Sequence, residues 1–155
     1  MKKDTELFCL YQDYMKELWQ YANTDAVKES LHLPEWWYDL THSKDIRLHT
    51  LYNGTKIIGF LFIEELKPED RERLNTKWYI NEAYILPEYR RRGLMSDLLD
   101  SALEKDADIC LHIIRNNTAA KDFWKNYFHK RKYCDYLLPV MEGYENCDFY
   151  RFSKV

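Results

Sequence analysis

Apolar residues in the first forty positions recur at the spacing of helices. The positions on one face of the first predicted helix are Leu7, Leu10, Tyr14, Leu18 and Tyr21. The run Asn23-Thr24-Asp25 then offers a break and an N-cap for a new helix. Pro34 can open a further short helix through Leu40, because proline is favoured at the first helical position. This part of the chain is therefore predicted to be helical.

Strand-like patterns follow in the middle of the chain. Residues 46–52 alternate apolar and polar side chains, residues 56–63 are mostly apolar, and Asn53-Gly54 lies between the two runs. Asn-Gly between two such runs is the strongest short signal for a β-hairpin. The sequence therefore predicts a hairpin over residues 46–63.

Beyond residue 66 the pattern alternates between strands and helices. The charged stretch Lys67–Arg73 is interpreted as a loop, and Trp78–Leu86 as a third strand that Pro87 stops. The elements expected after it are a helix from Gly93, a strand over Asp108–Ile114, a helix from Asn117, and two strands, Tyr133–Met141 and Asp148–Phe152, around a turn at Gly143. This order predicts an α/β fold, a mixed sheet with helices on both faces, in a single domain over residues 1–155.

Composition narrows the class of protein. The chain has 155 residues, a hydrophobic fraction of 46% and a net charge of −3, which argues against a nucleic-acid partner. The longest apolar run, residues 57–63, is too short to span a membrane. Four cysteines without metal-ligand spacing, in a chain without a signal-peptide pattern, favour reduced thiols, a cytoplasmic location and no metal. Thirteen tyrosines and five tryptophans predict an aromatic core, with an aromatic-walled ligand cleft as the alternative.

The clearest chemical signal lies between Tyr84 and Ser96. A strand ends at Pro87, a turn with three arginines follows, and a helix opens near Gly93. The N-terminus of a helix presents unpaired backbone N–H groups and a partial positive charge, which together hold phosphate groups. Glycine lets the backbone approach such an anion closely. From these residues alone, a solvated basic turn before an amphipathic helix is an equal alternative.

This segment resembles a known family signature. The run P-E-Y-R-R-R-G-L-M is similar to motif A of the GNAT acetyltransferase superfamily, whose pattern is Q/R-x-x-G-x-G/A. Arg90 fills the first position and Gly93 the fourth, whereas Met95 replaces the final small residue. That replacement implies a tighter or shifted coenzyme.

A second signature of the same family lies downstream. Asn117 and Ala120 fit its pattern, and Trp124 stands where the family usually has tyrosine. The resemblance covers residues 46–127 and the terminal strands, with the two signatures in the family's order and spacing.

The resemblance implies that acetyl-CoA binds in a V-shaped opening between two splayed middle strands of the sheet. Its pyrophosphate would lie on the loop before the predicted helix, and its pantetheine along the strand backbone. The residues implied in coenzyme binding are Tyr84, Ile85, Arg90, Arg91, Arg92, Gly93, Leu94, Met95, Ser96 and Asn117. A backbone N–H near Ile85 would also stabilise the oxyanion of the tetrahedral intermediate.

Two residues are candidates for the base that deprotonates the acceptor amine. Glu82 lies in the run N-E-A-Y-I-L-P, which resembles the E-G-x-x-V-L-P run of aminoglycoside 6′-N-acetyltransferases, where this glutamate holds or deprotonates the amine. The alternative is a strand carboxylate that faces solvent or a structural arginine. His112 matches the position where the protein N-terminal acetyltransferases of the superfamily carry a glutamate base. The alternative is an ordinary side chain on the polar face of its strand.

Trp124 is the third candidate for a catalytic role. The resemblance implies that this position protonates the departing CoA thiolate, but an indole N–H cannot act as an acid near neutral pH. Trp124 is therefore expected to position the thioester while water protonates the thiolate, unless another tyrosine such as Tyr127 substitutes.

The resemblance implies an N-acetyltransferase that moves the acetyl group of acetyl-CoA to a primary amine on a small molecule. Two alternatives stay open: an acetyltransferase for protein N-termini or lysines, and a CoA-binding module without turnover. In this family the acceptor is shaped by the N-terminal helices and the last hairpin. Candidate side chains there are the carboxylates of Glu35, Asp39, Glu142, Glu145 and Asp148 and the rings of Trp36, Trp37 and Tyr38. No nucleic-acid or membrane partner is expected, and a homodimer is left open.

Overall fold

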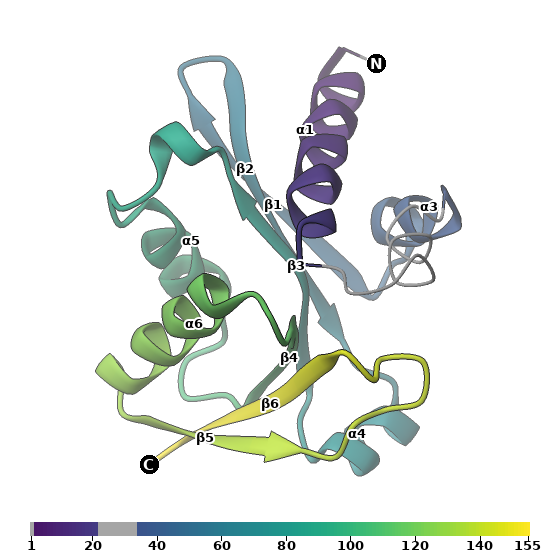
Figure 1. Ribbon diagram of the computed structural model, residues 1–155, viewed down its shortest axis with the longest axis vertical. Coiled ribbons are helices and arrows are strands. Elements are labelled where there is room, and N and C mark those ends of the chain that lie inside the picture. The colour runs from purple at the N-terminus through teal and green to yellow at the C-terminus, as the bar shows by residue number, and fades with distance from the viewer. Residues whose placement is uncertain (1, 22–33) are drawn as a thin grey trace. The chain divides into compact units, whose positions relative to one another are not determined.

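The computed structural model describes residues 2–21 and 34–155, and Figure 1 shows its elements along the chain. The helices are α1 (Lys2–Trp19), α3 (Pro34–His42), α4 (Pro68–Leu74), α5 (Leu94–Ala102) and α6 (Thr118–Lys130), with a short 3-10 turn η1 (Pro87–Tyr89). The strands are β1 (Ile46–Asn53), β2 (Lys56–Glu65), β3 (Trp78–Ile85), β4 (Ile109–Ile114), β5 (Tyr133–Leu138) and β6 (Cys147–Lys154). The predicted break at Asn23-Thr24-Asp25 lies outside the described residues.

The predicted mixed sheet is present, and its six strands lie in the order β1-β2-β3-β4-β6-β5. The first three residues of β3 and of β4 pair in parallel, Trp78–Ile80 with Ile109–Leu111. β6 is antiparallel to both β4 and β5. The chain divides into two compact units, one of residues 1–62 and 82–102 and one of residues 63–81 and 103–155, so β3 supplies residues to both. A single domain over residues 1–155 stays a prediction.

The core of the first unit is rich in aromatic side chains. α1 buries Leu7, Leu10, Tyr11 and Met15 on one face, and these residues belong to one apolar cluster. The other members of the cluster are Leu40 of α3, Ile57, Phe60 and Phe62 of β2, and Tyr84 of β3. The predicted helical spacing is confirmed. The most buried stripe is rotated slightly from the prediction, because Tyr14 and Leu18 are only partly buried against the cluster.

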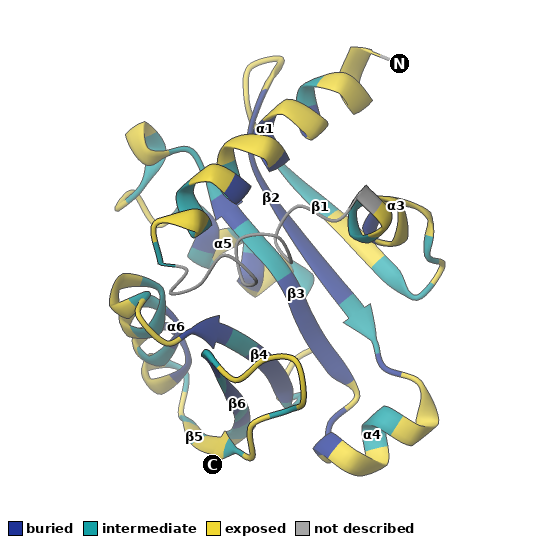
Figure 2. Ribbon diagram, turned by 45° about the vertical axis from the view of Figure 1, so that its right-hand side comes forward, coloured by how far each residue is buried: buried dark blue, intermediate teal, exposed yellow. Residues whose placement is uncertain are grey.

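The predicted hairpin is present between β1 and β2. Gly54 has a φ of 60°, the left-handed conformation that glycine adopts without strain. Every residue of β2 from Ile57 to Ile63 is buried, so both faces of this strand are covered (Figure 2). At Gly59 an added Cβ would lie 2.7 Å from the carbonyl oxygen of Tyr84, so this glycine allows β2 to approach the chain at the end of β3.

The interpretation of Lys67–Arg73 as a loop is wrong, because most of this stretch belongs to α4. Pro68 stands in the first turn of the helix, where its missing N–H costs nothing. Acidic residues occupy the first turn and basic residues the last, an order that complements the helix dipole. The helix ends at Asn75, which has a φ of 50°.

In the second unit, α6 covers one face of β6. The rings of Phe128 and Phe152 stack with their centroids 4.2 Å apart. Asn117 caps the helix, because its side-chain oxygen accepts a hydrogen bond from Ala120 N at 3.1 Å. Register places Phe149 beside His112 on the strands β6 and β4. Along β6, Phe149 points to the opposite face from Phe152, since successive side chains alternate.

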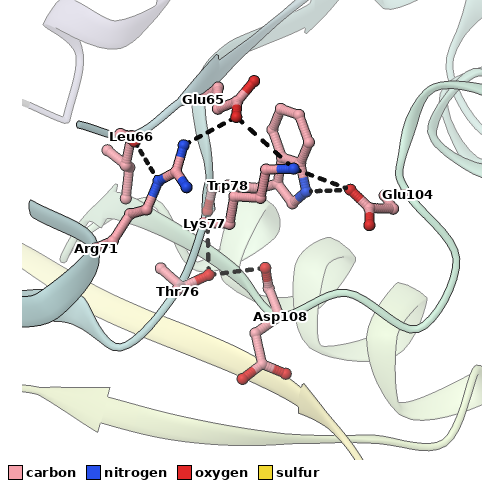
Figure 3. Close-up of polar contacts among 8 residues, drawn as sticks. All are labelled: Glu65, Leu66, Arg71, Thr76, Lys77, Trp78, Glu104 and Asp108. Carbon is pink, nitrogen blue, oxygen red and sulfur yellow. Dashed lines mark hydrogen bonds and ion pairs between the residues drawn. The ribbon is translucent and has the colours of Figure 1, made fainter. Parts of the chain in front are cut away.

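Polar contacts hold the start of β3 in place (Figure 3). The hydroxyl of the buried Thr76 donates to the carbonyl oxygen of Asp108 at 2.7 Å. The indole of Trp78 donates to Glu104 at 2.9 Å, and Arg71 of α4 donates to Glu65 at 2.8 Å. These contacts fix the residues before β3 and β4, where the two strands pair.

Candidate active site

The segment between β3 and α5 is a tight turn that leads into a helix. Arg91 and Gly93 both have positive φ, 61° and 76°. Backbone that passes through left-handed residues turns successive N–H groups to one side and forms anion-binding concavities. The first N–H groups of α5, from Leu94 onward, also have no partner within the helix. The loop thus has the backbone donors that a pyrophosphate requires.

Gly93 and Met95, which occupy the last two defined positions of the motif, have different surroundings. Gly93 is exposed, and an added Cβ there would meet no atom within 4 Å, so the glycine is needed for its φ rather than for space inside the protein. Met95 is buried, with 8% of its surface exposed. Its long side chain is therefore packed within the protein, and the effect of Met95 on the position of the coenzyme stays a prediction.

Arg90 has a structural contact that its place in the motif did not indicate. Its guanidinium donates two hydrogen bonds to the carboxylate of Glu17, each 2.7 Å long, and one to the carbonyl oxygen of Ile85 at 2.9 Å. It also lies over the ring of Tyr84, 5.3 Å from the centroid. The side chain of Arg90 therefore ties the loop to α1 and to the end of β3, and a contact of Arg90 with the coenzyme stays a prediction.

The other two arginines of the turn are exposed. Arg92 donates to the carbonyl oxygen of Glu88 at 3.0 Å and lies over the ring of Tyr89. Arg91 has its side chain at the surface of the loop. Both add positive charge beside the backbone donors, which favours a phosphorylated ligand.

Glu82 is held by two neutral hydrogen-bond donors in the first unit. Its carboxylate accepts a hydrogen bond from the Tyr14 hydroxyl of α1 at 2.6 Å and from the Trp36 indole of α3 at 2.9 Å. Burial raises the pKa of Glu82 to about 7, although these two hydrogen bonds act in the opposite direction. A carboxylate with a pKa near the working pH can take up and release a proton during catalysis. The donors that the structure gives Glu82 are therefore a hydroxyl and an indole rather than an arginine, and its role as a base stays a prediction.

His112 lies in the second unit among aromatic rings. Its Nδ1 forms a short hydrogen bond with the hydroxyl of Tyr79 on β3. The rings of Phe149 and Tyr144 lie 5.1 and 5.2 Å from the imidazole. Burial lowers the pKa of His112 to about 4, so the imidazole is neutral at physiological pH. Tyr79 was not predicted, and only its place on a strand beside His112 could have indicated the contact.

Trp124 is a packed residue of α6. It is 8% exposed, and its ring contacts those of Phe123 and Phe128, with centroids 5.1 and 6.2 Å away. Asn117, predicted to contact the coenzyme, uses its side-chain oxygen to cap the same helix. A coenzyme contact of either residue stays a prediction.

The residues proposed to shape the acceptor site have several different surroundings. Trp36 contacts Glu82, while Glu35, Tyr38 and Asp39 are exposed. Asp148 is paired with Arg115 and Lys121, at 3.1 and 2.9 Å, so it is already neutralised.

No group of three or more His, Cys, Asp or Glu side chains among residues 2–21 and 34–155 is arranged to hold a metal ion. In the same ranges, no helix has the length and apolar character needed to cross a membrane. All four cysteines are free thiols.

The first unit thus combines a turn whose backbone can bind an anion with a carboxylate of pKa about 7, a combination typical of enzymes that bind a phosphorylated coenzyme. The model of the acetyltransferase (GNAT) family matches residues 6–128 of the chain. The chain therefore belongs to the GNAT acetyltransferase family and is an acetyltransferase that uses acetyl-CoA as its acetyl donor. No curated protein sequence matches the chain.

Solved structures share this fold. The PaiA N-acetyltransferase of Thermoplasma acidophilum, in complex with coenzyme A, has a TM-score of 0.65 and 17% identity, over 97% of this chain and 92% of that one. Diaminobutyrate acetyltransferase EctA of Paenibacillus lautus, with its substrate and coenzyme A, has a TM-score of 0.62 and 13% identity, over 98% and 89%. Naa50 of Arabidopsis thaliana, with the bisubstrate analogue CoA-Ac-MVNAL, has a TM-score of 0.54 and 22% identity, over 80% and 82%.

Proposed function

We propose that the protein transfers the acetyl group of acetyl-CoA to a primary amine on a small molecule, with Glu82 as the residue that receives the amine's proton. The observation that carries this proposal is the pair of neutral donors on the Glu82 carboxylate. These donors orient the carboxylate without neutralising it, so its charge is left for a cationic acceptor. The pKa of about 7 then lets Glu82 accept the proton as the amine becomes nucleophilic.

In the proposed reaction a C–N bond forms between the amine and the acetyl carbon, and the C–S bond of the thioester breaks. Glu82 takes the proton that the amine loses, and the thiolate leaves as coenzyme A, protonated by solvent. Backbone N–H groups from Arg91 to Ser96 would hold the pyrophosphate, and a backbone N–H near Ile85 would stabilise the developing oxyanion. Bringing the amine and the thioester together supplies much of the remaining rate enhancement.

The test is release of coenzyme A from acetyl-CoA over a panel of small primary amines and short peptides. Glu82→Gln should lower kcat/KM for the best small amine by about 100-fold or more, with acetyl-CoA affinity preserved. His112→Gln is the matched control and should matter little. The opposite ranking would assign the proton transfer to His112, and no turnover with any amine would leave only a CoA-binding module.

Acetylation of a peptide amine is the second candidate function. It is favoured by the hydrogen bond between His112 and Tyr79, which orients the imidazole at the position of a base in the protein N-terminal acetyltransferases. A pKa of about 4 makes this imidazole a weak base, so it would act on an amine that has already lost its proton. A faster reaction with peptides than with small amines would support this alternative.

The cellular location and the oligomeric state of the protein are also proposals. The free state of all four thiols supports a cytoplasmic location, since thiols persist in a reducing compartment. Size-exclusion chromatography with light scattering would decide whether the protein forms the homodimer left open above.

A further inference from the structure

Tyr11 carries a buried hydroxyl without a hydrogen-bond partner. Only 5% of the residue is exposed, and its hydroxyl contacts no donor or acceptor among the described residues. Its ring is held firmly, with the ring of Trp37 at 4.7 Å and those of Tyr14 and Phe60 both at 6.2 Å. A phenylalanine would make the same ring contacts without the cost of an unpaired buried hydroxyl. The hydroxyl therefore requires an explanation outside the packing of the core.

The same region of the first unit holds the Glu82 carboxylate. The ring of Tyr11 lies 6.2 Å from that of Tyr14, whose hydroxyl donates to Glu82, and the charge of Glu82 adds to burial in raising the pKa of Tyr11. Glu82 accepts hydrogen bonds only from Tyr14 and Trp36, both neutral, and forms no ion pair within the described ranges. A carboxylate has about four lone-pair positions, so Glu82 can accept further donors. The Tyr11 hydroxyl and the Glu82 carboxylate can therefore both accept a hydrogen bond from a bound ligand.

We propose that the Tyr11 hydroxyl is a second anchor for the nitrogen of the acceptor, beside Glu82, and that the site selects primary amines whose nitrogen-bearing carbon has no carboxylate. This inference rests on the proposed function. An ammonium group offers three N–H donors, enough for a Glu82 oxygen and for the Tyr11 oxygen. After Glu82 takes one proton, a remaining N–H still donates to Tyr11 while the nitrogen lone pair is free to attack.

The side chains around Tyr11 and Glu82 indicate what the rest of the acceptor molecule should be. The rings of Tyr11, Tyr14, Trp36 and Trp37 pack around this region, and such rings favour a cation on an apolar chain. A carboxylate on the carbon beside the nitrogen would lie close to the Glu82 carboxylate. Arg90, whose guanidinium lies over the ring of Tyr84 in the same cluster, is already bound by both oxygens of Glu17. An amino acid would therefore meet an unscreened like charge, which disfavours its binding.

Tyr14 provides the contrast within the same helix. It lies one turn beyond Tyr11, and its hydroxyl is satisfied because it donates to Glu82. If the Tyr11 hydroxyl serves only a ligand, then Tyr11→Phe should raise the Tm of the ligand-free protein by about 2–4 °C and weaken amine binding. Stability and function move in opposite directions only if the hydroxyl has no partner in the free protein.

The experiment compares Tyr11→Phe with Tyr52→Phe, a control whose side chain is exposed on β1. Initial rates are measured with 2-phenylethylamine against phenylalanine and with pentylamine against norleucine, pairs that differ only in the carboxylate. We expect the amine of each pair to have at least a tenfold higher kcat/KM. We expect Tyr11→Phe to raise the KM for these amines about tenfold, with the KM for acetyl-CoA unchanged.

The possible failures can be told apart. If Tyr11→Phe leaves the amine KM unchanged or lowers the Tm, while Glu82→Gln still lowers kcat/KM by about 100-fold or more, the assignment of Tyr11 is wrong and the proposed function stands. If phenylalanine reacts as well as 2-phenylethylamine, the assigned class of acceptor is wrong. If no amine is acetylated, the proposed function fails and this inference fails with it.

Discussion

The Tyr14 hydroxyl donates a hydrogen bond to the Glu82 carboxylate at 2.6 Å and so joins α1 to β3 across 68 positions of sequence. Trp36 donates to the other oxygen of the same carboxylate from α3. Both hydrogen bonds favour the ionised form of Glu82, whereas burial favours the protonated form more strongly. The balance leaves the pKa of Glu82 near neutrality, so a change in either donor should move the pH dependence of the enzyme.

Tyr14→Phe should shift the acid limb of the kcat/KM profile to higher pH. The substitution removes a hydrogen bond that lowers the pKa of Glu82, so the pKa rises further above its ordinary value. Burial and the charge of Glu82 raise the pKa values of both Tyr11 and Tyr14, so the two hydroxyls stay neutral in this range. At pH 7 the rate should fall roughly threefold to tenfold and recover near pH 9.

The control for Tyr14→Phe is Tyr52→Phe, in which the lost hydroxyl lies at the surface of β1. Rates of the three proteins between pH 5.5 and about 9.5 provide the measurement. An acid limb that stays at the wild-type pH in Tyr14→Phe would show that Glu82 does not control the profile.

Stability should also depend on pH through Glu82. Its pKa rises from 4.5 to about 7 on folding, so the folded state binds this proton more tightly than the unfolded state. The contribution to stability is fully present below pH 4.5 and is lost as the pH rises through 7. Glu82→Gln, which cannot ionise, should therefore be more stable than the wild type at pH 8, and the advantage should shrink toward pH 5. Urea unfolding at the two pH values measures this difference, and an advantage that grows at low pH would contradict it.

Local signals accounted for the backbone of the fold. Asn53-Gly54 predicted the hairpin because the left-handed φ of Gly54 is a property of a few adjacent residues. The turn before α5 was found for the same reason. The charge order in residues 68–74 carried an equally local signal for a helix, which an interpretation based on polarity alone missed.

The contacts of the carboxylate could not be predicted in this way. Glu82 itself was selected from a resemblance to a family run, but Tyr14 and Trp36 lie 68 and 46 positions away. The spacing of α1 predicted Tyr14 but not Tyr11 on its apolar face, yet it could not indicate that Tyr14 donates to Glu82 while the Tyr11 hydroxyl has no partner among the described residues. Only the packing of α1 and α3 against β3 determines which hydroxyl reaches the carboxylate.

Gly93→Asp should weaken acetyl-CoA binding without preventing folding. Its side chain would enter open space, since an added Cβ meets no atom within 4 Å, but it would place a negative charge where the pyrophosphate is expected. A loss of about 2–4 kcal/mol of binding free energy is expected for an unpaired charge against an anion. Calorimetric titration measures it. Gly54→Asp is a matched control with a similar φ of 60° and equally open surroundings in the hairpin, and unchanged affinity in a folded Gly93→Asp protein would overturn the assignment of the loop.

Trp124→Phe and Trp124→Tyr should behave alike if the indole only packs. Trp124 is 8% exposed and lies among the rings of α6, so its replacement by phenylalanine should cost about 1–2 kcal/mol of stability through lost packing. A phenol at this position could protonate the CoA thiolate, but that thiolate is a tolerable leaving group near neutral pH. Turnover of the two variants should therefore agree within about threefold, which corresponds to roughly 0.7 kcal/mol in barrier.

The pH–rate profiles of the wild type and the two Trp124 variants separate packing from chemistry. If thiolate protonation limits the rate, Trp124→Tyr gains a limb at high pH that Trp124→Phe lacks, because only the phenol can ionise. If Trp124→Phe loses turnover while it still binds acetyl-CoA and unfolds cooperatively, the indole N–H takes part in the reaction. We expect neither result, because the ring contacts of Trp124 with Phe123 and Phe128 account for its position in α6.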